Sequence, residues 1–129
     1  MTADLATLRA LKERCEAAAG SDRELDHDLI VHFAGSGNLM AMLRHYPLTS
    51  SIDAALALVE RVLPGAGYDL DYVPGGDPLC GCRIFQDDVL GNASGEGATL
   101  PLAALSALFD ALISRAAALI SRAEEARQS

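Results

Sequence analysis

The amino-acid sequence predicts a small, helix-rich α+β domain, a layered α/β sandwich with an antiparallel, hairpin-based sheet. Two observations lead to this fold class. Apolar residues recur every three or four positions over most of the chain, as in amphipathic helices, but between residues 68 and 86 the period shortens to two, as in strands. The chain has 129 residues, no internal repeat and no dividing linker, so residues 1–129 are expected to form a single domain.

Two helices are expected at the N-terminal end. The first should start after Asp4 and end at Gly20, and the second should start at Ser21, which has the capping-box spacing to Glu24. Glycines at positions 35 and 37 should end the second helix. The apolar stripes are Leu5, Leu8, Leu11 and Cys15 in the first helix and Leu25, Leu29, Ile30 and Phe33 in the second.

The middle of the chain contains an ambiguous segment followed by the clearest helix. Residues 38–46 fit a buried strand as well as a helical turn, and both alternatives stay open. After Pro47, Thr49, Ser50 and Ser51 offer hydroxyls that can cap a third helix, which Pro64 and Gly65 terminate. Leu58 lies to the other side of this helix and is expected to matter less for stability. The stripe expected to enter the core is Ile52, Leu56, Val59 and Leu63.

A β-hairpin is expected next. Tyr68, Leu70 and Tyr72 alternate with Asp69 and Asp71, so the two sets should point to opposite faces of a strand. Residues 74–78 supply proline and glycine for the turn, and a second strand should cover residues 80–86. Residues 87–99 are rich in Gly, Asn, Ser and Asp and are expected to form a surface loop, with room for a short strand around residues 89–90.

A long helix should close the chain. Thr99 and Pro101 can open it, and it is expected to fray over residues 124–129. Its apolar residues cover more of the circumference than one core-facing stripe uses, which favours a homodimer. These residues are Leu102, Leu105, Phe109, Leu112, Ile113, Leu119 and Ile120.

Composition limits the classes of partner. Eighteen acidic residues against ten basic ones give a net charge of −8, so repulsion disfavours nucleic acid and anionic lipid. No uninterrupted apolar run approaches the roughly 18 residues of a membrane span. The first residues lack a signal-peptide pattern, and a cytoplasmic location is expected. Cys15, Cys80 and Cys82 are an odd number of cysteines, as is typical of free thiols.

Two groups of residues are candidate sites. No catalytic triad, metal-ligand spacing or cofactor motif is recognisable, so we expect no enzyme activity, metal or cofactor. A charged, partner-facing patch is the first candidate, and a solvated sheet face is its alternative interpretation; its members are Asp69, Asp71, Arg83, Asp87 and Asp88. The second candidate is a ligand site near a loop or a helix start that could attract an anion such as a nucleotide; its members are His45, Tyr46, Gly95, Gly97 and Thr99.

Two segments carry a resemblance to a known family. Asp22, Arg23, Glu24, Leu25 and Asp26 lie in one expected helix, and Tyr46, Thr49, Ser51, Ile52, Asp53, Ala54 and Ala55 lead into the next. With the strand pair and the Ala- and Leu-rich helix that follow, residues 21–118 resemble small bacteriophage and prophage proteins of the phage ABA sandwich domain family. The resemblance implies an accessory protein with an α/β/α layered fold and no assigned catalytic residues. Residues 1–20 would add a helix, and residues 119–129 would form the fraying end.

We therefore expect a non-enzymatic phage or prophage accessory protein that binds a host protein or a small signalling ligand, for example to counter a host defence. One alternative is a structural or assembly component whose acidic surface keeps it soluble. Another is a nucleotide-binding protein that uses the glycine-rich stretch before the last helix. Because burying an unpaired carboxylate costs several kcal/mol, we expect Asp69 and Asp71 to be exposed even though an α/β/α sandwich covers both sheet faces.

Overall fold

The computed structural model describes residues 4–33, 48–86 and 91–128, and it confirms the α+β class. Three strands form one antiparallel sheet in the order β1-β2-β3. The elements in chain order are α1 (Leu5–Ala17), α2 (Arg23–His32), α4 (Ile52–Val62), β1 (Gly67–Tyr72), β2 (Cys80–Phe85), β3 (Asn92–Gly97) and α5 (Leu100–Gln128).

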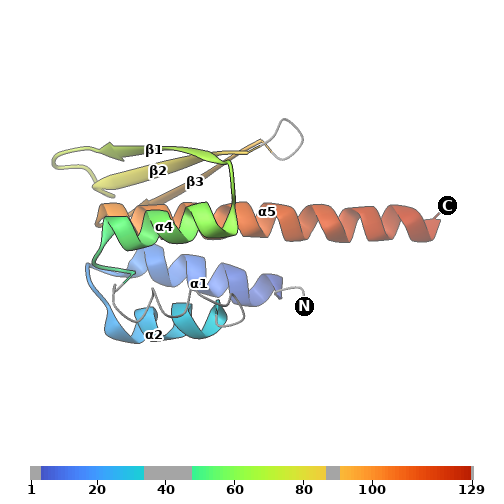
Figure 1. Cartoon of the computed structure of the whole chain (residues 1–129), viewed down its shortest axis with the longest axis horizontal. Helices are drawn as coiled ribbons and strands as arrows, with labels where there is room; N and C mark the ends of the chain where they lie inside the picture. The colour runs from blue at the N-terminus through green and yellow to red at the C-terminus, as the bar shows by residue number, and fades with distance from the viewer. Residues whose placement is uncertain (1–3, 34–47, 87–90, 129) are drawn as a thin grey trace.

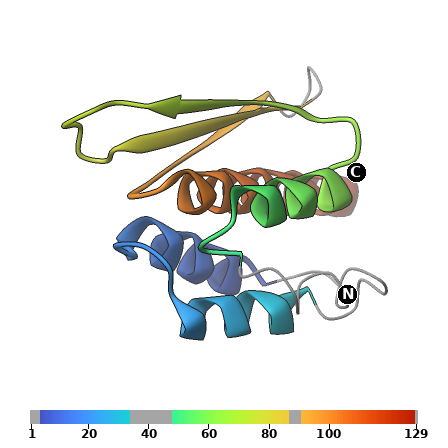
Figure 2. The same ribbon diagram turned by 60° about the vertical axis from the view of Figure 1, so that its left-hand side comes forward.

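The elements form layers, with the sheet on one side of the molecule (Figure 1). Beneath the sheet lie α5 and α4, and α1 and α2 follow on the far side of these helices (Figures 1 and 2). Within the described residues, helices cover one face of the sheet. The α/β/α order that the resemblance implies is therefore not seen in this part of the chain, and the second sheet face is open.

Helix α5 is the centre of this arrangement. It packs against the sheet on one side and against α1 and α4 on the other, so residues 101–109 are buried all round. Helix α5 is long and apolar enough to pass for a membrane span, but the core helix of a globular domain passes the same test. The helix continues to Gln128, through the residues that are expected to fray. Its C-terminal part extends beyond the other layers (Figure 1).

Side chains cap the first three helices. Asp4 accepts a hydrogen bond from a backbone amide at the start of α1, which begins after Asp4 as predicted, and Ser51 does the same for α4, so it is the cap among the three hydroxyls expected there. The predicted capping box at Ser21 is wrong by one residue, because the cap of α2 is Asp22, whose carboxylate accepts from the Leu25 amide at 3.0 Å. Helix α2 ends at His32. The glycines expected to end it, and the ambiguous residues 38–46, lie outside the described residues.

A buried carboxylate joins α2 to the segment before α4. Asp26 is 7% exposed, and its Oδ1 accepts a hydrogen bond from the Thr49 amide at 2.7 Å. In return, the Thr49 hydroxyl accepts from the Asp22 amide at 2.9 Å. Asp22, Asp26 and Thr49 all belong to the two segments that carry the family resemblance, and the structure places these segments side by side.

The buried face of α4 differs from the predicted stripe. Leu58 is completely buried together with Val59 and Leu63, whereas Ile52 and Leu56 are partly exposed. The face turns toward Leu58 because Ala54 and Ala55 are also buried, and such small side chains allow close helix packing. The prediction weighted the large apolar residues and ignored the alanines.

Strand β3 corrects the surface loop expected over residues 87–99. Ala93, Gly95 and Gly97 alternate toward α5 and are buried, while the intervening polar residues face outward. A Cβ atom on Gly95 would lie 2.1 Å from the Ala107 backbone nitrogen, so only glycine permits this approach of β3 to α5. Residues 87–90, which include the expected short strand, lie outside the described residues.

Candidate functional site

The open side of the sheet, which we call the outer sheet face, collects polar side chains from all three strands. The period-two alternation of each strand directs them away from the helices. Asp69 and Asp71 are exposed there, so the predicted exposure of these carboxylates is confirmed. The outer sheet face consists of Gly67, Asp69, Asp71, Gly81, Arg83, Phe85, Asn92, Ser94 and Glu96, and Phe85 is its one large apolar residue.

The strand register arranges these residues in rows across the sheet. One row places Gly81 between Asp71 of β1 and Glu96 of β3. The next row places Arg83 between Asp69 and Ser94. Each row therefore combines residues from both edge strands with one residue of the central strand.

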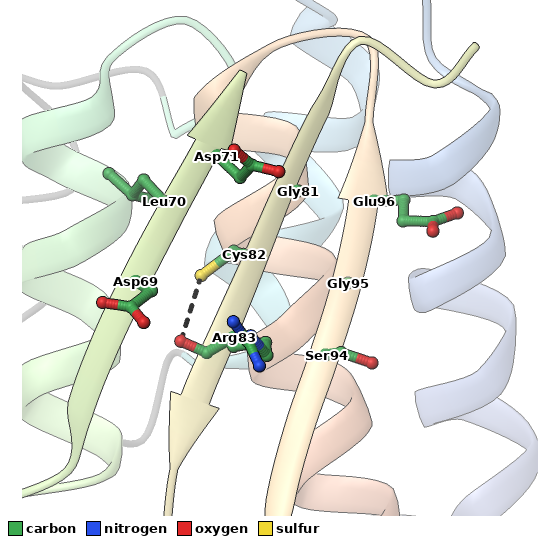
Figure 3. Close-up of a pocket in the computed structure, with 9 residues that line it drawn as sticks. All are labelled: Asp69, Leu70, Asp71, Gly81, Cys82, Arg83, Ser94, Gly95 and Glu96. Atoms are coloured by element: carbon green, nitrogen blue, oxygen red, sulfur yellow. Dashed lines mark hydrogen bonds between the residues drawn. The ribbon is translucent and has the colours of Figure 1, made fainter. Parts of the chain in front are cut away.

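A hollow of about 410 Å³ lies on this face, because Gly81 contributes no side chain to the middle of the sheet. In Figure 3 the Asp71 side chain reaches toward Gly81, and the Glu96 side chain is directed away from it, beyond β3. Arg83 projects from the central strand below Gly81 (Figure 3). Within the described residues Arg83 forms no ion pair with Asp69. A charged group of a partner can therefore enter the hollow without displacing an existing ion pair.

Of the predicted partner-facing patch, the structure brings together Asp69, Asp71 and Arg83. Asp87 and Asp88 lie outside the described residues. The sequence analysis missed Gly81, Ser94 and Glu96. The signal for the last two was present, because residues 92–97 read Asn-Ala-Ser-Gly-Glu-Gly, a strict alternation of polar and small residues.

The predicted ligand site is not assembled in the described residues. Gly95 and Gly97 are buried against α5, and the Thr99 hydroxyl accepts from the Leu102 amide at 3.4 Å, which caps α5 internally. The premise of a flexible glycine-rich loop is therefore wrong. His45 and Tyr46 lie outside the described residues.

The thiols belong to the core. Cys15, Cys80 and Cys82 are free and buried, and the last two lie on the inner sheet face beside Ile84. Burial raises the pKa of the Cys15 thiol to about 12 and that of the Cys82 thiol to about 11. Both thiols are thus protonated at neutral pH and unsuited to nucleophilic chemistry.

The last residue of α2, His32, is likewise part of the packing. His32 contacts the rings of Phe33 and Phe109 edge-on, at centroid distances of 4.8 and 5.8 Å. Burial lowers the pKa of His32, which favours the neutral ring. In the part of the chain that the structure describes, no three His, Cys, Asp or Glu residues are grouped to hold a metal ion.

No protein-family model matches this sequence, and comparisons with curated proteins and with solved structures find no similar protein. The phage family therefore stays an expectation from the sequence resemblance.

Proposed function

We propose that the protein is a non-enzymatic binding protein whose outer sheet face binds a basic surface of a protein partner. The observation that carries this proposal is the open sheet face, where Asp69, Asp71 and Arg83 line a hollow above Gly81 and the Glu96 side chain extends beyond β3. In the phage setting that the resemblance implies, the partner would be a host protein.

Electrostatics supports a basic partner. The chain carries a net charge of −8, and the outer sheet face presents three carboxylates against one guanidinium. Such a field attracts a basic surface from a distance and accelerates association at low salt. Four of the nine residues that line the hollow are charged and a fifth is a serine, whereas small-molecule sites are mostly apolar with few charged groups, which favours a protein over a small signalling ligand.

Charge reversal on the outer sheet face tests the proposal. The Asp69→Lys/Asp71→Lys variant should fold normally, because exposed charges contribute little to stability. It should lose basic proteins that the unmodified chain captures from bacterial lysate, and rising salt should weaken that capture. Glu60→Lys/Glu124→Lys is the matched control, because it makes the same charge change at exposed positions on helices. If both variants capture the same proteins as the unmodified chain, the acidic surface is only solubilising and the proposal is wrong.

A side chain at position 81 would fill the hollow, and it should change stability and binding in opposite directions. A Cβ on Gly81 would have Gly95 O as its nearest neighbour at 3.8 Å, so a larger residue fits. Gly81→Thr should raise the free energy of unfolding by about 0.5–1 kcal/mol, because glycine weakens a strand interior. The same variant should bind the captured partner less tightly. Unchanged affinity in a more stable protein would place the binding surface elsewhere.

A further inference from the structure

Strand β1 is an edge of the sheet, and its outward backbone groups have no strand to pair with among the described residues. The Val73 amide donates to the Leu79 carbonyl at 2.8 Å, which fixes the odd-numbered residues of β1 as those that bond to β2. The N–H and C=O groups of Tyr68, Leu70 and Tyr72 therefore point outward. These groups form a template for one more strand.

The opposite edge of the sheet is strand β3, which has partners in α5 and α1. There, the Ser94 amide of β3 donates to the Asp110 carboxylate of α5 at 3.0 Å. Helix α1 also contacts β3. The Asp110 side chain thus accepts a hydrogen bond from an outward amide of β3, whereas the outward N–H and C=O groups of β1 are left available to a partner.

The charges of β1 select what can pair with it. In an antiparallel pair of two β1 strands, Asp69 and Asp71 of one copy would face the same carboxylates of the other, and like charges directly opposite are destabilising. A strand with basic residues at these positions would instead gain opposite-charge pairs on the outer sheet face.

The inner side of the same edge is apolar. Tyr72 is 59% exposed, and Tyr68 and Leu70 are partly buried against the core. Helix α4 lies on the helical side of the sheet, and Figure 3 shows it beyond the free edge of β1. An added strand would therefore lie over the helical layer, where apolar side chains are favoured.

We propose that β1 binds an extended segment of the partner that alternates basic and apolar residues and adds a fourth strand to the sheet. This inference rests on the proposed function and deepens it, because the basic side chains of the segment would reach Asp69 and Asp71 while its backbone pairs with β1. Main-chain hydrogen bonds supply affinity in such strand addition, and alternate side chains supply specificity.

A proline in β1 tests the backbone pairing. Tyr72→Pro removes an outward N–H without touching the ladder to β2, and edge strands accept proline at such positions. Tyr72→Ala removes the same side chain but keeps the N–H, so it is the matched control. The probe is a short synthetic peptide that alternates lysine and valine, titrated into each folded variant by calorimetry. We expect Tyr72→Pro to bind it about tenfold more weakly than Tyr72→Ala.

A second measurement uses the unmodified protein, so it does not depend on the folding of a variant. A peptide of the same sequence, N-methylated on one hydrogen-bonding edge, should lose affinity, and the same peptide methylated on its other edge should keep it. The parent peptide should protect the amides of Tyr68, Leu70 and Tyr72 from hydrogen exchange.

Equal binding of both methylated peptides, or of the Pro and Ala variants, would overturn strand addition. So would no binding of the parent peptide at millimolar concentration. If Asp69→Lys/Asp71→Lys still abolishes partner capture in that case, the outer sheet face binds the partner without strand pairing, and only this inference fails.

Discussion

At the scale of single residues, the contact between Asp26 and Thr49 shows how polar groups fix the position of a helix. Asp26→Ala leaves the buried Thr49 amide without its acceptor. We expect a loss of about 1–3 kcal/mol in the free energy of unfolding, the usual penalty for an unsatisfied buried group. Asp28→Ala is the control, because its half-exposed ion pair with Arg14 should be worth less than about 1 kcal/mol. Equal denaturant midpoints for the two variants would contradict this account.

The buried thiols predict how stability depends on pH. The folded-state pKa of Cys15 is raised to about 12, while an unfolded thiol ionises near 9. Its stabilising effect is therefore complete below about pH 9 and is lost as pH rises toward 12. The urea midpoint should therefore fall as the pH is raised from about 9 to about 10.5. The Cys15→Ala variant should be less stable at neutral pH, but its urea midpoint should fall less over this range. An equal fall in both proteins would show that ionisation of the Cys15 thiol does not cause the loss of stability.

At the scale of elements, the orientation of α4 buries Leu58, so this side chain should contribute strongly to the stability of the protein. Leu58→Ala should cost about 2–5 kcal/mol, because the side chain is completely buried and its loss leaves a cavity. Leu56→Ala should cost less, since Leu56 is partly exposed. Denaturant unfolding of the two variants measures the order, and a larger loss for Leu56→Ala would restore the stripe inferred from sequence.

Sequence patterns predicted the elements whose signals are local. Asp4 and Ser51 marked helix starts because side-chain capping depends on a few neighbouring residues. The β1–β2 hairpin followed from the alternation of residues 68–72. The same alternation placed Asp69 and Asp71 in the candidate site, together with Arg83 of the second strand.

Strand β3 could not be predicted in the same way. Its residues are poor strand formers, and its conformation depends on contact with α5, in which Gly95 and Gly97 allow close approach. Missing this strand also removed Ser94 and Glu96 from the candidate site. The face of α4 was misjudged for a related reason, because its orientation depends on where α5 lies.

At the scale of the whole molecule, the packing of α5 restricts the surface through which a homodimer would form. The apolar circumference of α5 is covered within the chain over residues 101–109, so this part of the helix needs no partner. Leu119 and Ile120 are 53% and 47% exposed on the part that extends beyond the other layers. The dimer stays a prediction, now placed at these two residues. Sedimentation at micromolar concentration should show a dimer that Leu119→Lys/Ile120→Lys converts to a monomer, and a monomeric parent protein would refute it.

The central position of α5 has a consequence for synthesis on the ribosome. Each layer of the domain packs against α5, and this helix follows all the other elements in the chain. Until α5 has left the exit tunnel, α1, α4 and the β1–β2 hairpin have no common surface to bury against, and their apolar sides stay open to chaperones or to other nascent chains. Folding is therefore completed late in translation, and a chain interrupted before α5 would be a substrate for proteases rather than a smaller working protein.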